Sequence, residues 1–340
     1  MKKLLALLLA MLICFALVAC DKCKDGHTFE NGVCTACGEE DPDYVEIVKF
    51  DLYGSAMTLG NTLEINLIID TSKFTGTDNY AVVTKQYADE RGLVSKTVAQ
   101  SEWSTLGGTL KYVPYAVSAK EMNDELTITI YNADGVQISN TYVDSVAGYC
   151  VRMLVKEEQK AAPSAKKMTL FVDMVNYGAA AQAEWSYNAE NLANAGLTEA
   201  QKAYASEVGE LENNQVKGTG YVGTSFTLQE NILMNILFDQ DIYAQTAYAK
   251  VSFVDHYGND ESFTVAAADF GTLSSWRYVQ ITTMAVADGR QPITVELYNA
   301  ESEVISTTVD SVESYAQRKP KDLHDAMMAF CIGAYNYFHT

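Results

Sequence analysis

Leu126-Thr-Ile-Thr-Ile-Tyr131-Asn-Ala-Asp-Gly135, followed by Val143-Asp-Ser-Val146-Ala-Gly-Tyr149-Cys-Val-Arg152, is a stretch that the chain contains twice. The second copy is Ile293-Thr-Val-Glu-Leu-Tyr298-Asn-Ala-Glu-Ser302, followed by Val309-Asp-Ser-Val312-Glu-Ser-Tyr315-Ala-Gln-Arg318. A one-residue gap is enough to align the two. Each copy predicts a strand, a turn, a second strand and the start of a helix.

Short apolar runs of strand-like length surround the first copy and are separated by turn residues such as Gly107-Gly108 and Asp134-Gly135. The predicted strands are Val45 to Leu52, Leu63 to Ile69, Tyr80 to Tyr87, Leu93 to Val98, Leu110 to Val117, Leu126 to Asn132 and Val136 to Val143. Short strands at this density, without helical patterns between them, predict an antiparallel, Ig-like β-sandwich.

Helical patterns follow the strands. Apolar residues from Val146 to Leu154 fall at helical spacing, with Asp144 or Ser145 as the N-cap. A second helix is predicted around the apolar stripe Leu170, Met174, Tyr177 and Ala181. The predicted unit is therefore a β-sandwich followed by helices, which makes the chain mainly β with helices (α+β).

The whole unit recurs further along the chain. Thr58-Leu59 matches Thr227-Leu228, and Trp103 to Leu106 matches Phe270 to Leu273. The last helix repeats the earlier stripe with Leu323, Met327, Phe330, Ala334 and Tyr337, and Phe338 stands in the place of Trp185. The residues that the copies share are apolar or turn-forming, and we interpret the shared Asp144 and Asp310 as helix caps. Function is therefore expected where the copies differ.

These patterns divide the chain into five parts. The predicted parts are a signal peptide at 1–19, a lipidated cysteine with a Cys/His knuckle and acidic linker at 20–43, repeat 1 at 44–187, a linker with a short helix from Thr198 to Glu212 at 188–214, and repeat 2 at 215–340. The helix segment Asn176-Tyr-Gly-Ala-Ala-Ala-Gln182 is similar to modules repeated in large surface proteins of Gram-positive anaerobes. That resemblance implies a location and an architecture but no activity.

The N-terminus indicates the compartment. Lys2 and Lys3 precede an apolar run, Leu4 to Ala16, which is shorter than the roughly 20 residues needed to span a bilayer. The run ends at Leu17-Val-Ala-Cys20, which resembles the lipobox of bacterial lipoproteins. The resemblance implies that Cys20 becomes the lipidated N-terminus and anchors the chain at the cell surface. The alternative is an ordinary secreted protein that is cleaved after Ala19.

A cysteine module follows the expected anchor. Cys23, His27, Cys34 and Cys37 have the spacing Cys-x3-His-x6-Cys-x2-Cys, and Gly38 suits a left-handed residue after the last pair. Four such ligands match a structural zinc site, and the stretch looks like a short zinc-ribbon-like knuckle. A disulfide and an unstructured spacer are the alternatives.

The sequence contains no catalytic motif that we can identify, so a non-enzymatic protein is expected. His256 is interpreted as a polar turn residue rather than a general base, and His324 is placed on the solvent side of the last helix. Cys150 and Cys331 are interpreted as small buried hydrophobes. A net charge of -20 disfavours nucleic acid as a partner.

Aromatic residues are the remaining candidates for binding. Trp276 has no aromatic counterpart in repeat 1 and is the best single candidate for a surface contact, although packing is the commoner role of such a ring. The expected function is display of a binding, adhesion or spacer module to an extracellular glycan or protein. The alternative is a glycan-binding accessory protein or a glycan hydrolase.

Overall fold

The structure is a computed structural model that describes residues 26–30, 33–41, 49–60, 62–228, 232–319 and 321–339. The chain divides into a small unit that ends at Lys49 and a large unit that begins at Phe50. In the small unit, β1 (Phe29–Glu30) pairs with β2 (Val33–Cys34). Cys20, Cys23 and the first half of the predicted strand Val45 to Leu52 lie outside the described residues. In the second half of that strand, only Phe50 pairs, in an isolated bridge with Ser139.

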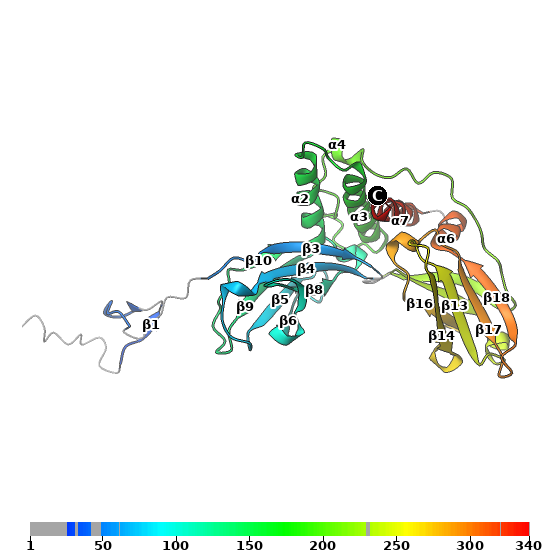
Figure 1. Cartoon of the computed structure of the whole chain (residues 1–340), viewed down its shortest axis with the longest axis horizontal. Coiled ribbons are helices and arrows are strands. Elements are labelled where there is room, and N and C mark those ends of the chain that lie inside the picture. Colours follow the sequence, from blue (N-terminus) through cyan, green and yellow to red (C-terminus); the bar gives the residue numbers. More distant parts are fainter. Residues whose placement is uncertain are drawn as a thin grey trace, which may run out of the picture. The chain divides into compact units, whose positions relative to one another are not determined.

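The large unit begins with a sandwich of two four-stranded sheets whose strands all pair antiparallel (Figure 1). One sheet has the order β3 (Gly54–Leu59), β4 (Leu63–Asp70), β8 (Leu110–Ala116) and β7 (Ser104–Gly107). The other has the order β10 (Tyr142–Asp144), β9 (Glu125–Tyr131), β5 (Tyr80–Gln86) and β6 (Leu93–Ala99).

The second sandwich repeats this topology strand for strand. One sheet has the order β11 (Tyr221–Leu228), β12 (Ile232–Phe238), β16 (Trp276–Ile281) and β15 (Gly271–Leu273). The other has the order β14 (Asp260–Ala266), β13 (Tyr248–Val254), β17 (Ile293–Tyr298) and β18 (Val304–Asp310). The predicted fold class is therefore confirmed: two antiparallel sandwiches in tandem, each followed by helices.

Alternating side chains fill the core of each sandwich. Leu126, Ile128 and Ile130 of β9 are buried, as are Ile293, Val295 and Leu297 at the corresponding positions of β17. Because successive side chains of a strand point to opposite faces, this period of two turns one face of each strand towards the partner sheet. The repeated stretch, Leu126 to Tyr131 in one copy and Ile293 to Tyr298 in the other, thus supplies a central strand to each core.

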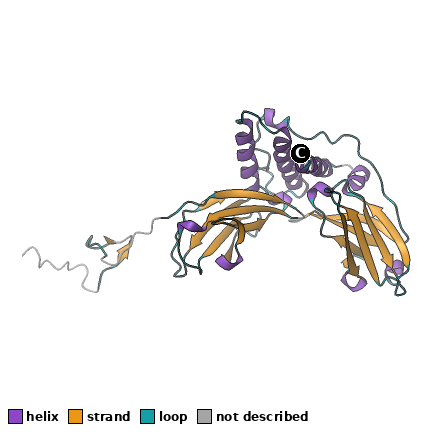
Figure 2. Cartoon of the chain, viewed as in Figure 1, coloured by secondary structure: helices purple, strands orange, loops and turns teal. Residues whose placement is uncertain are grey.

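Helices follow each sandwich (Figure 2). The first is followed by α2 (Val146–Glu158) and α3 (Ala165–Glu184), and the second by α6 (Val312–Arg318) and α7 (Asp322–Phe338). The short helices are α4 (Glu199–Lys202) and α5 (Gln240–Tyr243), with 3-10 turns at η2 (Thr71–Lys73), η3 (Gln100–Glu102), η4 (Ala119–Glu121), η5 (Ala267–Asp269) and η6 (Val286–Asp288).

The interpretation of Asp144 and Asp310 as helix caps is wrong. The N-cap of α2 is Ser145, whose hydroxyl accepts a hydrogen bond from the Gly148 amide at 2.9 Å, and the N-cap of α6 is Ser311. Each aspartate is the last residue of its strand, and it pairs with an arginine on the helix that follows. Asp144 lies 2.6 Å from Arg152, and Asp310 lies 2.7 Å from Arg318.

The helices α3 and α7 join the two repeats (Figure 1). Tyr177 of α3 stacks on Phe330 of α7 with ring centroids 5.6 Å apart, and these two residues occupy the same position in their repeats. Lys321, before α7, reaches Glu184 at the end of α3 at 2.6 Å. Lys166, at the start of α3, reaches the carbonyl of His339 beyond α7 at 2.9 Å. The helices are thus antiparallel, and an approximate twofold axis relates α3 to α7.

Several sequence expectations differ from the structure. The strand predicted over Val136 to Val143 is confined to β10, because polar residues precede it and the Ser139 hydroxyl accepts a hydrogen bond from the Ile130 amide. Two strands that the sequence did not predict, β3 and β7, contain glycine at an end and carry weak apolar patterns. The helix predicted over Thr198 to Glu212 is confined to α4.

His324 is also placed differently from the prediction. Only 8% of its surface is exposed, its ring meets Tyr315 edge-on at 5.0 Å, and its Nδ1 contacts the carbonyl oxygen of Lys319. The short helix α6 packs against α7 on this side, which covers a face that would be open to solvent on an isolated helix. Cys150 and Cys331 are buried, as predicted.

Replacement of Asp310 by Ala is expected to lower the free energy of unfolding by about 3 kcal/mol, because it removes a buried carboxylate and leaves the partly exposed Arg318 without its partner. The carboxylate of Asp310 is fully buried and also accepts a hydrogen bond from the Thr224 hydroxyl at 2.6 Å. Urea unfolding followed by circular dichroism measures the change. Glu199→Ala is the control, because it removes an exposed ion pair with Lys202. Equal midpoints for both variants would contradict the assignment.

Candidate metal site and inter-repeat cavity

Three of the four predicted metal ligands lie together in the small unit. The ligand atoms of His27, Cys34 and Cys37 are all within 4.8 Å of one another. The Sγ of Cys37 is 3.4 Å from the Nδ1 of His27. Around a tetrahedral zinc ion with ordinary bond lengths, a sulfur and a nitrogen ligand lie about 3.5 Å apart. These three residues could therefore hold a metal ion, while Cys23 lies outside the described residues.

The local backbone arranges the two thiols. Gly38 has the predicted left-handed conformation, with φ of +76°, and its amide donates to the Cys34 carbonyl at 2.8 Å. The backbone amides of Ala36 and Cys37, with the His27 side chain, lower the pKa of Cys34 to about 6. A thiolate is the form of cysteine that binds metal, so this turn favours the ligating state.

Glu39 is a further part of this site that sequence reasoning missed. Its Oε2 lies 3.4 Å from the Nε2 of His27, which leaves the Nδ1 of the same ring facing Cys37. Metal-bound histidines commonly donate their second ring N–H to a carboxylate, which fixes the tautomer and the ring orientation. The signal available in the sequence was only an acidic residue next to Gly38, in a run of acidic residues.

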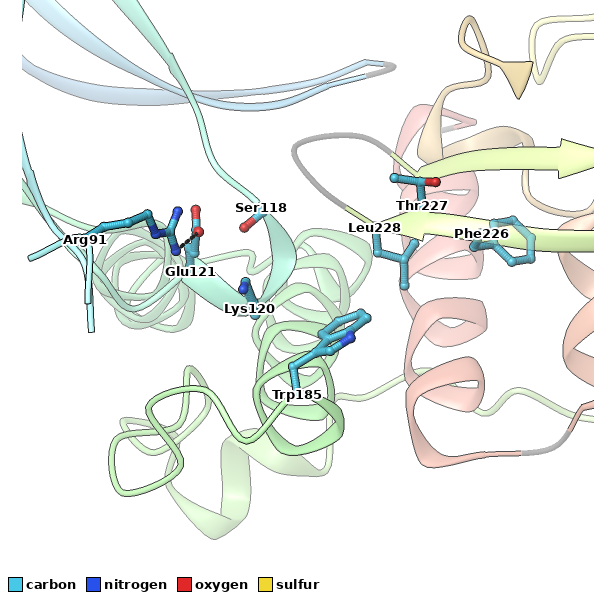
Figure 3. Close-up of a pocket in the computed structure, with 8 residues that line it drawn as sticks. All are labelled: Arg91, Ser118, Lys120, Glu121, Trp185, Phe226, Thr227 and Leu228. Carbon is cyan, nitrogen blue, oxygen red and sulfur yellow. Dashed lines mark hydrogen bonds and ion pairs between the residues drawn. The ribbon is translucent and has the colours of Figure 1, made fainter. Parts of the chain in front are cut away.

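A cavity of about 530 Å³ lies in the large unit, where the first repeat meets β11 of the second (Figure 3). The first repeat contributes Arg91, Lys120 and Glu121 from its sandwich and Trp185 from the end of α3. The second repeat contributes Phe226 and Leu228 of β11. Charged groups thus line one side of the cavity and apolar groups line the other.

An ion-pair network supports the charged side. The Lys85 ammonium, of which only 1% is exposed, lies 2.7 Å from Glu121. Arg91 lies 2.7 Å from the other oxygen of Glu121 and 2.6 Å from Asp89. Within the described chain Lys120 makes no salt bridge, and its ammonium lies over the ring of Tyr187 at 4.9 Å. Two cations therefore pair with two carboxylates, and Lys120 stays outside these ion pairs.

Asp124 lies behind this network and is buried. Desolvation raises its pKa to about 6, although the Tyr187 hydroxyl donates to it at 2.5 Å and opposes the rise. The same hydroxyl accepts a hydrogen bond from the Ala88 amide at 3.0 Å. Tyr187 therefore ties the chain after α3 to the turn between β5 and β6, which holds Arg91 in place beside the cavity.

The second repeat has aromatic rings and a histidine at the corresponding place, beside a cavity of about 370 Å³ that is lined by Phe338, Met57 and Leu59. His256 lies in the turn between β13 and β14, with its Nδ1 2.6 Å from the carboxylate of Asp288, and its backbone amide donates to the same oxygen at 2.7 Å. Asp288 occupies the position of Glu121. The His256 ring lies 4.0 Å from Tyr257 and 5.4 Å from Phe338, which occupies the position of Trp185. His256 is thus a turn residue, as predicted, but its side chain is buried and structural. The two repeats differ most in side-chain chemistry at this place.

The predicted surface residue Trp276 lies elsewhere. It begins β16, pairs across the hairpin with Leu273 and is 39% exposed. It does not line the cavity, and its role in binding stays a prediction. The cavity itself could not be predicted, because Arg91, Lys120, Trp185 and Phe226 are scattered along the sequence and share no motif.

Comparisons with known proteins identify no family for this chain. No family model matches the chain, and no curated protein matches it. Among solved structures, the chain is similar to the two fibronectin type-III domain segment from chicken tenascin, at 10% identity and a TM-score of 0.17. The match covers 76% of this chain and 97% of that one. At such a TM-score the likeness carries no weight, and the fold rests on the strand pairing described above.

The buried Asp124 predicts a pH dependence of stability. Its pKa is raised from 3.8 to about 6 in the folded chain, so its contribution is fully present below about pH 4 and is lost as the pH rises through 6. Between pH 4 and 7 the wild type should lose about 2 kcal/mol of unfolding free energy relative to Asp124→Asn. Urea unfolding at a series of pH values measures the difference.

Tyr187→Phe provides the matched control for this prediction. It removes a donor that stabilises the ionised carboxylate, so the pKa of Asp124 in the folded chain should rise further. The loss of stability should then begin at the same pH as in the wild type but extend to a higher pH and become larger. Parallel stability profiles for the wild type and Asp124→Asn across this range would show that Asp124 does not titrate as described.

Proposed function

We propose that this chain is a lipid-anchored protein of the bacterial cell surface that acts as a non-enzymatic binding, adhesion or spacer protein. The observation that carries the proposal is the α3–α7 contact, in which Tyr177 stacks on Phe330. It joins two sandwiches and their helices into one compact unit from Phe50 onward. Such a unit can present two related surfaces to an extracellular glycan or protein.

The anchor rests on the N-terminal sequence. Leu17-Val-Ala-Cys20 supports lipidation of Cys20, and two or more acyl chains hold a protein at a membrane stably. None of the helices in the described part of the chain has the length and apolarity needed to span a bilayer. The lipid at Cys20 is thus the proposed route of membrane attachment.

The small unit is proposed to hold a structural zinc ion. Cys23 would complete the set formed by His27, Cys34 and Cys37, and a site with four protein ligands has no open position for catalysis. With so few residues to form a core, metal binding would provide most of the folding free energy of this module.

Binding is favoured over hydrolysis for the inter-repeat cavity. Glycoside hydrolysis requires two carboxyl groups on opposite sides of the scissile bond. Among the described residues that line the cavity, Glu121 is the one carboxylate, and both its oxygens are engaged by Lys85 and Arg91. A carboxylate held by two cations is a poor proton donor. Of the two alternative functions, glycan binding and glycan hydrolysis, this cavity therefore favours glycan binding.

Cys20→Ser is expected to release the protein from membranes, because it removes the site of lipidation. Fractionation of the producing bacterium into membrane and soluble parts, followed by immunoblotting, measures the shift. Cys23→Ser is the matched control, since it removes a thiol three residues downstream and should leave the protein in the membrane fraction. Membrane retention of Cys20→Ser would refute the lipid anchor.

The purified mature chain should contain about one zinc ion, and the double replacement of Cys34 and Cys37 by Ser should abolish it. Elemental analysis measures the stoichiometry, and competition with a chromogenic chelator measures the affinity. Glu39→Gln should keep the zinc but weaken its binding about tenfold or more, because the histidine loses its orienting partner. Cys150→Ala removes a buried thiol in the large unit and should leave the zinc unchanged. A metal-free wild type containing a disulfide would contradict the zinc proposal.

A further inference from the structure

The geometry points to a sugar acid as the ligand of the inter-repeat cavity: one or two sugar rings, of which one carries a carboxylate. This inference rests on the proposed function and deepens it, since it names the chemical class that the binding module recognises. It follows from the size of the cavity, from its aromatic side and from the charge of Lys120.

The volume of the cavity sets the scale of the ligand. At about 530 Å³ it falls within the range of roughly 300 to 1,000 Å³ that is usual for small-molecule sites. One or two sugar rings fit this space, whereas a folded partner does not. The cavity is bounded by both repeats, so a ligand there contacts both sandwiches at once.

The aromatic side provides a surface for the apolar face of a sugar ring. Trp185 is 44% exposed although it is the residue that ends α3, where its amide donates to the Ala181 carbonyl at 3.2 Å. Figure 3 shows Leu228 across from its ring, whereas the ring of Phe226 is turned away from it and packs edge-on against Tyr315. An exposed large aromatic ring held by a helix end loses little conformational entropy when it contacts a ligand.

The charged side selects for an anionic group. Lys85 and Arg91 are neutralised by Glu121 and Asp89, which leaves Lys120 as the cation that a ligand can pair with. A carboxylate on the ligand would form a charge-assisted hydrogen bond with Lys120, while Glu121 and the Thr227 hydroxyl could bond to ring hydroxyls.

The corresponding place in the second repeat supports this reading. There, Asp288 is paired with His256, and the rings of Tyr257 and Phe338 pack against that histidine. The equivalent cavity beside Phe338, of about 370 Å³ and lined on its other side by Met57 and Leu59, is also open. In the second repeat Ala287 stands in the position of Lys120, so the two copies differ in this cation and not in the presence of an open space.

The test uses the full mature chain in detergent and three probes: glucuronate, glucose and acetate. Binding is measured by isothermal titration calorimetry and by saturation-transfer NMR. Glucuronate should bind at least tenfold more tightly than either glucose or acetate, because it alone engages both sides of the cavity. Lys120→Met should weaken glucuronate about tenfold and leave glucose unchanged. Trp185→Ala should weaken both sugars.

Two variants serve as matched controls. Lys202→Met removes an exposed lysine, and Trp276→Ala removes an exposed tryptophan, at places that do not line the cavity. Neither should change glucuronate binding, and urea unfolding should show that all four variants fold.

Glucuronate binding that is no tighter than acetate binding, or that survives Lys120→Met, would overturn the inference. Loss of binding in Trp276→Ala alone would place the site on β16 instead. The membrane fractionation of Cys20→Ser is unaffected by any of these outcomes, so it tests the proposed surface location separately.

Discussion

The ion pair between the buried Asp144 and the partly exposed Arg152, repeated as Asp310 and Arg318, fixes the helices to both sandwiches. Each aspartate is the last residue of a strand, and each arginine lies eight residues later on the helix that follows. A hydroxyl from the facing sheet, that of Ser55 or Thr224, completes the contact. Breaking such a pair leaves a charge without compensation at a buried site, so the angle between strand and helix is tightly held. The positions of α3 and α7, and therefore of the cavity, depend on this joint.

The α3–α7 contact explains why the two repeats form one unit. Residues at equivalent positions meet across it, as Tyr177 and Phe330 do, and the lysine near the start of each helix reaches the end of the other. The buried Asp173 lies in the same contact, close enough to Gly333 that a side chain there would collide with its carboxylate. The amide and hydroxyl of Ser206 donate to Asp173, which compensates in part for its burial. The linker after α3 therefore contributes to the contact between the repeats.

The sequence predicted the features that depend on local pattern. The period of two in strands such as β9 and β17, the duplication, and the left-handed Gly38 are all visible in the order of residues. The features it did not reveal depend on tertiary contacts. Whether Asp144 or Ser145 caps α2 depends on Arg152, which attracts the carboxylate, and the burial of His324 depends on α6 covering it. The cavity joins residues from four separate segments, and no periodicity or spacing connects Arg91 with Phe226.

The approximate twofold axis between α3 and α7 has a consequence for how such a chain can diverge. A symmetric homodimer of single repeats would present the same self-complementary surface from both partners, and every substitution would appear twice. With both repeats on one polypeptide, each side of the axis can change independently. Glu121 can then hold Arg91 and Lys85 beside one cavity, while Asp288 pairs with His256 at the equivalent place in the other repeat. Gene duplication and fusion would thus allow one half to specialise in recognition while the other supplies a stable packing partner.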